Sequence, residues 1–233
     1  MTTPIPNWQQ LRELLEKEDF IDVADSKLCS EENLETIAEH GGRYITVVPR
    51  NLKEVQAFLQ RVRNGEDMIW QERCDVPDAR KKGRVQSYRI HVGEVMEEGG
   101  RILWVHSTSK AQVEHDAREQ RIVKAEQALE KIVSGANQRA LKTREQIEAA
   151  LQKATQGVAE YLSVTLDEVN TTERVQVGRG RPGPNTRYEE VEQVHYQVQW
   201  QRDEKAIARA ARTDGLFPLT DNTDLPAVEV LRT

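Results

Sequence analysis

One short stretch near the amino terminus limits the fold of this chain more than any other. An apolar run at residues 20–24 ends at Asp25, and Ser30 suits the N-cap of a helix whose apolar residues recur at helical spacing as far as His40. Residues 44–48 then form a second apolar run. The order strand, acid, helix, strand predicts two parallel strands, because the helix provides the crossover that parallel strands need.

Asp25 is the candidate functional residue of this unit. It follows the first strand at its carboxyl end, which is where ligands collect in open α/β sheets. Asp22 lies on the strand itself and points to the opposite face, so the two carboxylates cannot form one site. The alternative for Asp25 is structural, because a carboxylate in this position also caps a turn by accepting backbone N–H groups.

Apolar spacing predicts further helices and strands along the chain. We expect helices at residues 7–17, with Asn7 as N-cap and an apolar face of Trp8, Leu11, Leu14 and Leu15, and at residues 52–62, ended by Gly65. We expect strands at residues 88–92 and 101–105, joined as a β-hairpin, at 174–177 and 191–200, separated by a Gly-Pro-rich linker, and at 216–219 after the turn Asp214-Gly215.

Two long helical stretches lie in the middle of the chain, at residues 110–134 and 139–162. The short loop Gly135-Ala136-Asn137 between them predicts an antiparallel helical hairpin. A dimerising coiled coil is the alternative, but the alanine content and the lack of a sustained heptad repeat disfavour it.

Composition narrows the class of protein. Only 37% of the residues are hydrophobic and 31% are charged, so we expect an extended, exposed insertion rather than one compact globule. The formal net charge of −6 argues against a uniformly basic nucleic-acid binder. Two widely spaced cysteines favour a reducing compartment and predict no metal site. No stretch resembles a membrane span or a signal peptide, so we expect a cytoplasmic protein.

Two basic segments are candidates for contact with DNA. The stretch Gly178–Pro184 carries Arg179 and Arg181 on an extended backbone, and arginines of this kind enter the narrow minor groove of A/T-rich DNA. The same composition also makes an ordinary exposed linker, so both interpretations stay open. A basic turn supplies the second segment, with Arg80, Lys81, Lys82 and Arg84. The five histidines are scattered without metal-ligand spacing, which predicts structural or exposed positions.

Residues 20–50 resemble bacterial insertion-sequence transposases of the DDE class, which have a ribonuclease H-like core. The second Asp of the catalytic triad of these enzymes stands in a setting similar to residues 24–28, Ala-Asp-Ser-Lys-Leu. Further similar stretches lie at residues 178–183 and 214–220, so the resemblance covers nearly the whole chain. At residues 220–222 the order Thr-Asp-Asn departs from the family's usual Thr-Asn.

The resemblance implies an α/β fold in three parts: a partial ribonuclease H-like core at residues 1–65, an insertion domain at 66–212 with β-hairpins and the helical hairpin, and a return strand at 213–233. It also implies DNA transposition by metal-dependent phosphodiester hydrolysis and strand transfer. In the family, three carboxylates hold two Mg²⁺ ions, and transposon ends are the partner.

Of the three carboxylates, the resemblance places only Asp25 in this chain. The first Asp of the family lies upstream of the matched stretch, and the Glu lies beyond the position of Thr233. We therefore expect a transposase truncated at both ends that holds Mg²⁺ weakly or not at all and does not cut DNA alone. The alternatives are a non-catalytic DNA-binding or regulatory derivative and a pseudogene product without function, and self-association stays open.

Overall fold

The structure is a computed structural model and has mixed α/β architecture. It describes residues 4–16, 20–77, 83, 85–96, 100–138, 140–184 and 186–233. The chain forms two compact units: the first contains residues 1–116 and 209–233, and the second contains residues 117–208. Helix α4 (Thr108–Gly135) begins in the first unit and continues in the second. Within the described residues, no helix combines the length and apolar character that crossing a membrane requires.

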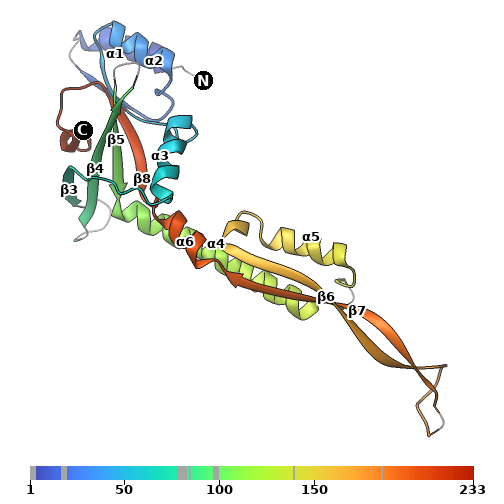
Figure 1. The fold of residues 1–233 in the computed structure, drawn as a ribbon. Coiled ribbons are helices and arrows are strands. Elements are labelled where there is room, and N and C mark those ends of the chain that lie inside the picture. Colours follow the sequence, from blue (N-terminus) through green and yellow to red (C-terminus); the bar gives the residue numbers. More distant parts are fainter. Residues whose placement is uncertain are drawn as a thin grey trace. The chain divides into compact units, whose positions relative to one another are not determined.

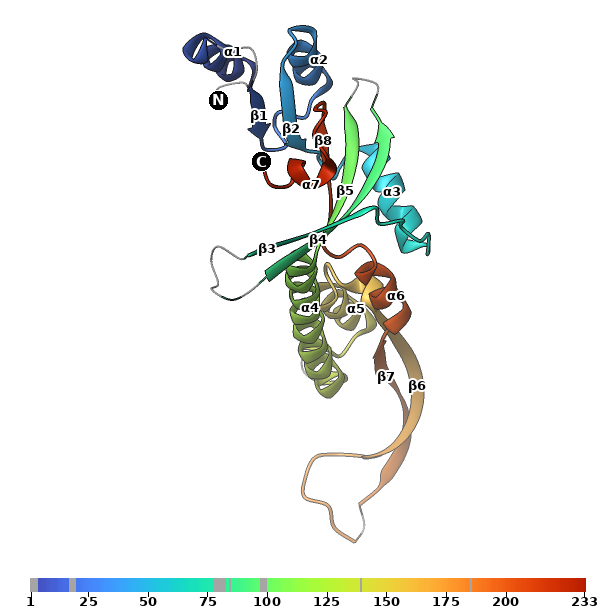
Figure 2. The same ribbon diagram turned by 90° about the vertical axis from the view of Figure 1, so that its left-hand side faces the viewer.

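A six-stranded mixed sheet forms the centre of the first unit (Figure 2). Its strands follow the order β1 (Ile21–Ala24), β2 (Arg43–Val47), β8 (Leu216–Asp221), β5 (Arg101–Ser107), β4 (Val85–Val95) and β3 (Glu72–Pro77). Strands β1 and β2 are parallel, and every other neighbouring pair is antiparallel. Strand β8 therefore inserts residues from the end of the chain between two strands from its first half.

The expected strand, acid, helix, strand unit is confirmed. In the β1–β2 pair, Ile21 lies opposite Arg43 and Ala24 lies opposite Thr46. Helix α2 (Glu31–Glu39) connects the two strands, and the side chain of Ser30 accepts a hydrogen bond from the N–H of Asn33 at its start. The mixed α/β class is thus observed, whereas the ribonuclease H-like core stays a prediction.

The first helix differs from the expectation. Helix α1 spans Pro4–Leu15, so Asn7 lies inside it and the prediction of Asn7 as N-cap is wrong. Proline is tolerated in a first helical turn, where no intrahelical partner exists for its missing N–H. Of the predicted apolar face only Trp8 is buried, while Leu11, Leu14 and Leu15 are exposed.

Different helices cover the two faces of the sheet. Helix α3 (Lys53–Arg63) packs through Val55, Phe58, Leu59 and Val62 on one face, where Trp104 of β5 contributes. Helix α7 (Ala227–Val230) packs on the other face with Leu103 and Val105, the neighbours of Trp104 in the strand. Because successive side chains of a strand point to opposite faces, one continuous apolar run in β5 serves both cores.

A buried ion pair lies within this sheet. Asp221, at the end of β8, is fully buried, and its carboxylate accepts two hydrogen bonds from the guanidinium of Arg101, at 3.0 and 3.2 Å. The N–H and the hydroxyl of Thr223 donate to the same carboxylate. Asp221 therefore joins β8 to β5.

The hairpin predicted at residues 88–92 and 101–105 is confirmed as the antiparallel pair β4–β5, with a register shift between Val92 and Val95. Its turn, at residues 97–99, lies outside the described residues. Strand β3, antiparallel to β4, was not expected. Half of its residues are charged and only Cys74 is buried, so the apolar alternation that signals a strand is too short to detect.

The second unit contains most of α4, helix α5 (Arg144–Ala154) and a two-stranded ribbon (Figure 1). The prediction of one helix over residues 139–162 is wrong. The helix starts late because Thr143 and Gln146 form a capping box, and it ends at Thr155, with Gly157 in a left-handed conformation just beyond. Residues of α4 and α5 line a common groove, as expected for two helices joined by a reversing loop.

The ribbon is a single antiparallel hairpin of β6 (Leu162–Gln176) and β7 (Tyr188–Arg202), linked to α5 by a short 3-10 helix (Ala159–Tyr161). Both strands are longer than the predicted 174–177 and 191–200. The Gly-Pro-rich linker is the turn of this hairpin, since the N–H of Val177 donates to the carbonyl of Arg187 across it. Helix α6 (Glu204–Ala211) then leads back to the first unit.

Candidate functional site

Asp25 lies directly after β1, at the carboxyl end of the parallel pair, and its side chain is exposed. One carboxylate oxygen accepts the N–H of Lys27 at 2.9 Å. The carbonyl of Asp25 accepts the hydroxyl of Thr46 at 2.8 Å, which ties the turn to β2. The backbone of Asp25 is therefore tied to β2, while its side chain stays exposed.

The chain offers Asp25 little help in holding a metal ion. Mg²⁺ bound in a protein usually takes more than one carboxylate together with substrate oxygens and water. Among the described residues, no group of three or more His, Cys, Asp or Glu side chains is placed to bind a metal. Asp22 lies on β1 itself, and burial raises the pKa of its carboxyl above the ordinary value. Asp25 is therefore a single exposed carboxylate at the end of β1.

The basic stretch predicted to contact DNA lies at the tip of the ribbon. Arg179 and Arg181 are both exposed, and Gly178 and Gly180 have φ values of +104° and +139°, which side chains rarely permit. The side chain of Gln176 donates to the carbonyl of Gly180 at 3.1 Å, so part of the loop is held against the end of β6.

Charge is divided along the ribbon. From residue 174 to residue 188 the sequence contains four arginines and no acid: Arg174, Arg179, Arg181 and Arg187. Closer to the base, β6 and β7 carry the acids Asp167, Glu168, Glu173, Glu189, Glu190 and Glu192. The tip is therefore the part of the ribbon that attracts a polyanion, and the shaft repels one. The second basic segment, with Arg80, Lys81, Lys82 and Arg84, lies outside the described residues.

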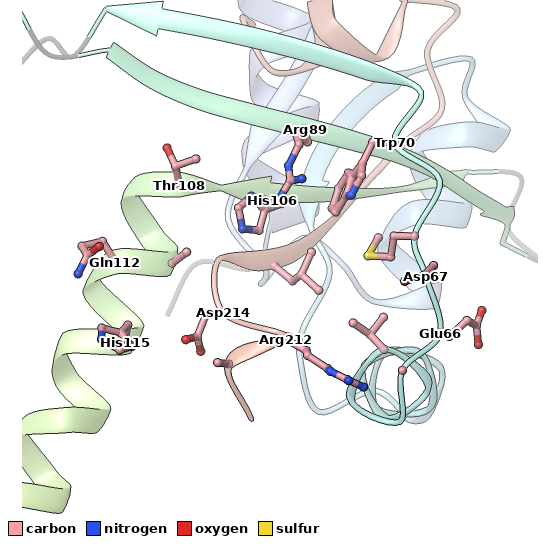
Figure 3. Close-up of a pocket in the computed structure, with 16 residues that line it drawn as sticks. Glu66, Asp67, Trp70, Arg89, His106, Thr108, Gln112, His115, Arg212 and Asp214 are labelled. Carbon is pink, nitrogen blue, oxygen red and sulfur yellow. Dashed lines mark hydrogen bonds between the residues drawn. The ribbon is translucent and has the colours of Figure 1, made fainter. Parts of the chain in front are cut away.

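A cavity of about 630 Å³ lies elsewhere in the first unit (Figure 3). It is lined by the segment after α3, by β4 and β5, by the start of α4 and by the segment before β8. Polar and aromatic side chains surround it, among them Glu66, Asp67, Trp70, Arg89, His106, Gln112, His115, Arg212 and Asp214.

Trp70, Arg89 and His106 form one connected wall of this cavity (Figure 3). The guanidinium carbon of Arg89 lies 4.7 Å from the centre of the Trp70 ring. The Arg89 nitrogen Nη2 is 3.5 Å from Nδ1 of His106, whose ring meets Trp70 edge-on at 5.8 Å. Burial, and then the charge of Arg89, lower the pKa of His106, so its imidazole is predominantly neutral at neutral pH.

The start of α4 is fixed beside this cavity by Glu114. Its carboxylate accepts the N–H of Gly215 at 2.7 Å and pairs with Lys110 at 2.9 Å and Arg50 at 3.3 Å. Burial would raise the pKa of Glu114, but these donors outweigh it and the pKa lies below its ordinary value. Glu114 therefore joins α4 to the turn that precedes β8.

Comparisons with family models, with curated proteins and with solved structures found no match to this chain. Sequence reasoning identified Asp25, Arg179 and Arg181 as site residues, and the structure brings Asp25 and the two arginines to separate units. It did not find the cavity, because its walls come from segments far apart in the chain. The histidines His106 and His115 carried no spacing signal that could have connected them.

Proposed function

We propose that this chain is a DNA-binding derivative of a DDE transposase that does not cleave DNA by itself. The observation that carries the proposal is the position of Asp25, exposed at the carboxyl end of a parallel strand pair whose sequence resembles the second-Asp segment of that family. A purely structural role of Asp25 as a turn cap accounts for the hydrogen bond from Lys27. It does not explain why the surrounding sequence resembles that of transposases.

The outer edge of β1 supports this proposal. Among the strands that the structure describes, β1 is the last one on its side of the sheet, next to β2. Edge strands present free N–H and C=O groups that a further strand can pair with. A strand added there would run beside Asp25 and could bring a second carboxylate to it, which is what a Mg²⁺ ion requires. Asp25 would then be one of several metal ligands rather than the whole site.

The ribbon supports the DNA-binding part of the proposal and favours the non-catalytic alternative. An extended tip with two exposed arginines between glycines fits a narrow minor groove, whereas the acidic shaft cannot follow the phosphate backbone. Contact with DNA would therefore be short, and few phosphates would be neutralised. We expect weak binding that is lost as salt rises, with a slope of about 0.9 per phosphate contact on logarithmic axes.

Fluorescence anisotropy with short A/T-rich and G/C-rich duplexes at low salt tests the DNA-binding role. Replacing Arg179 and Arg181 together by Ala should weaken binding to the A/T-rich duplex about tenfold or more. The matched control removes two positive charges from exposed helical positions of the same unit, Lys131→Ala with Lys153→Ala, and should change affinity less than about twofold. Equal losses in the two double variants would mean that only net charge matters and that the tip is no binding element.

A paramagnetic ion tests the role of Asp25. Mn²⁺ at millimolar concentration should broaden the amide resonances of residues 25–27, and Asp25→Asn should abolish the effect whereas Asp22→Asn should not. The same preparations should fail to nick supercoiled plasmid with Mg²⁺ or Mn²⁺. Nicking that disappears in Asp25→Asn would show that the chain holds a complete active site, and Mn²⁺ broadening centred elsewhere would remove Asp25 from the proposal.

A further inference from the structure

The cavity beside Trp70 holds a positive charge that the structure does not neutralise. Arg89 contacts the ring of Trp70 and Nδ1 of His106. Within the part of the chain that the structure describes, no carboxylate lies close enough to Arg89 to form an ion pair. Arg89 is itself exposed, so its guanidinium is open to solvent and remains a charge-assisted donor for an anionic ligand.

Two of the other charged groups around the cavity are engaged with partners outside this wall. Glu66 pairs with Arg61 at 3.5 Å. Arg212 donates to the carbonyl of Arg63 at 3.2 Å, so it satisfies the end of α3 and is a structural cation. Figure 3 shows Arg212 and Asp214 on the opposite side of the cavity from Arg89. Arg89 and His106 are therefore the pair best placed to receive an anionic group.

The size and lining of the cavity limit what the ligand can be. At about 630 Å³ it is within the range of small-molecule sites, and it has room for much more than an inorganic phosphate. Apolar side chains, including Val62, Met68 and Leu216, alternate with hydrogen-bonding groups, including Gln112 and His115, over the remaining surface. A ligand that fits has one anionic end and a larger body with both apolar and polar parts.

We propose that this cavity binds a phosphorylated ligand of nucleotide size, with the phosphate on Arg89 and His106. The planar guanidinium of Arg89 is kept in place by Trp70, so little side-chain freedom would be lost when it donates to phosphate oxygens. The ring of His106 would supply a second donor beside it. The site is separate from Asp25 and from the ribbon tip, and it does not depend on the transposase proposal.

Titrations of the full chain with thymidine 5′-monophosphate, with inorganic phosphate and with thymidine test this site. Binding is followed by calorimetry and by the indole N–H resonance of Trp70, identified with Trp70→Phe. We expect the nucleotide to bind with the highest affinity, phosphate more weakly and thymidine not measurably. Arg89→Gln and His106→Gln should each weaken nucleotide binding about tenfold, and Arg89→Lys, which keeps the charge but not the planar group stacked on Trp70, should weaken it by a smaller but measurable factor.

Arg232→Gln is the matched control, because Arg232 is exposed and does not line the cavity. It should leave nucleotide affinity unchanged. Thermal unfolding of each variant checks that it is folded, and Arg89→Lys keeps the test decisive if Arg89→Gln does not fold. Thymidine binding as well as its monophosphate would overturn the proposal. So would an affinity that Arg89→Gln and Arg232→Gln lower equally, or no nucleotide binding at millimolar concentration.

The phosphate could come from a free nucleotide or from a DNA strand, and a further measurement separates these sources. A short single strand is titrated into the chain with Arg179 and Arg181 replaced by Ala, so that the ribbon tip does not contribute. Binding to the strand tighter than to the monophosphate, and sensitive to Arg89→Gln, assigns the site to nucleic acid. Weaker binding to the strand than to the monophosphate assigns it to free nucleotides.

Discussion

The sheet of the first unit and the ribbon of the second are both made largely of antiparallel ladders, yet they differ in what covers them. In the sheet, α3 and α7 pack on opposite faces, and Leu103 and Val105 of β5 are completely buried. In the outer ribbon, residues on both faces are exposed, including Val175 on one face, 40% exposed, and Val194 on the other, 51% exposed. Backbone pairing alone therefore does not make a core, because the stabilising burial comes from the helices laid over a sheet.

The ribbon also shows how a long hairpin keeps its shape without a cover. At its base, Asn137 exchanges two hydrogen bonds with the backbone of Tyr196, at 2.7 and 2.9 Å. Arg202 forms hydrogen bonds with Glu126 and Glu119 of α4, which raise the pKa of its guanidinium. Polar contacts anchor one end of the ribbon, and the remainder depends on its own cross-strand pairs.

Removing an ion pair should give the largest difference in unfolding free energy between the sheet and the ribbon. Asp221→Ala leaves Arg101 largely buried without its partner, and we expect a loss of about 3–5 kcal/mol in the free energy of unfolding. Glu168→Ala removes the exposed partner that Arg144 has on the ribbon, and the cost should be much smaller. Urea denaturation measures both. Similar costs would mean that burial does not distinguish the two pairs.

Shortening an apolar side chain should give the second largest difference in stability between the sheet and the ribbon. Leu103→Ala empties a fully buried position between β5 and α7, and we expect a loss of about 3 kcal/mol. Val175→Ala removes two methyl groups from an exposed ribbon face and should cost less than about 0.5 kcal/mol. Hydrogen exchange of the β5 and β6 amides reports each region by itself. A loss at Val175 as large as that at Leu103 would show that something covers the ribbon in solution.

The smallest effect concerns Glu114, which supports the first unit beside the cavity. The pKa of Glu114 lies below its ordinary value of 4.5 in the folded protein, so its interactions stabilise the fold above that pH and are lost as pH falls through the lower folded-state pKa. As the pH falls from 4.5 to the folded-state pKa of Glu114, the free energy of unfolding of the wild type should decrease. The Glu114→Gln variant should not show this decrease, because it has no carboxylate to protonate at this position. Urea denaturation across this acidic range measures the difference, and parallel curves would rule out the contribution of Glu114.

Local signals in the sequence determined a considerable part of this fold. The apolar run before Asp25, the cap at Ser30 and the second run at residues 44–48 predicted the parallel pair and the exposed position of Asp25. The alternation in β4 and β5 predicted their hairpin. The predictions of these elements are confirmed because strand, cap and turn preferences act between residues close in the chain. The family assignment, the three-part domain division and the roles of Asp25, Arg179 and Arg181 stay predictions.

Contacts between distant segments decided the rest. No local pattern indicates that β8 pairs with both β2 and β5, that Asp221 meets Arg101, or that Arg89 and His106 share a cavity with Trp70. The ribbon is an intermediate case, since its valine and threonine content permits strands but their length depends on pairing with a partner strand. Propensity acts along the chain, whereas burial and charge pairing depend on what the folded chain places opposite each residue.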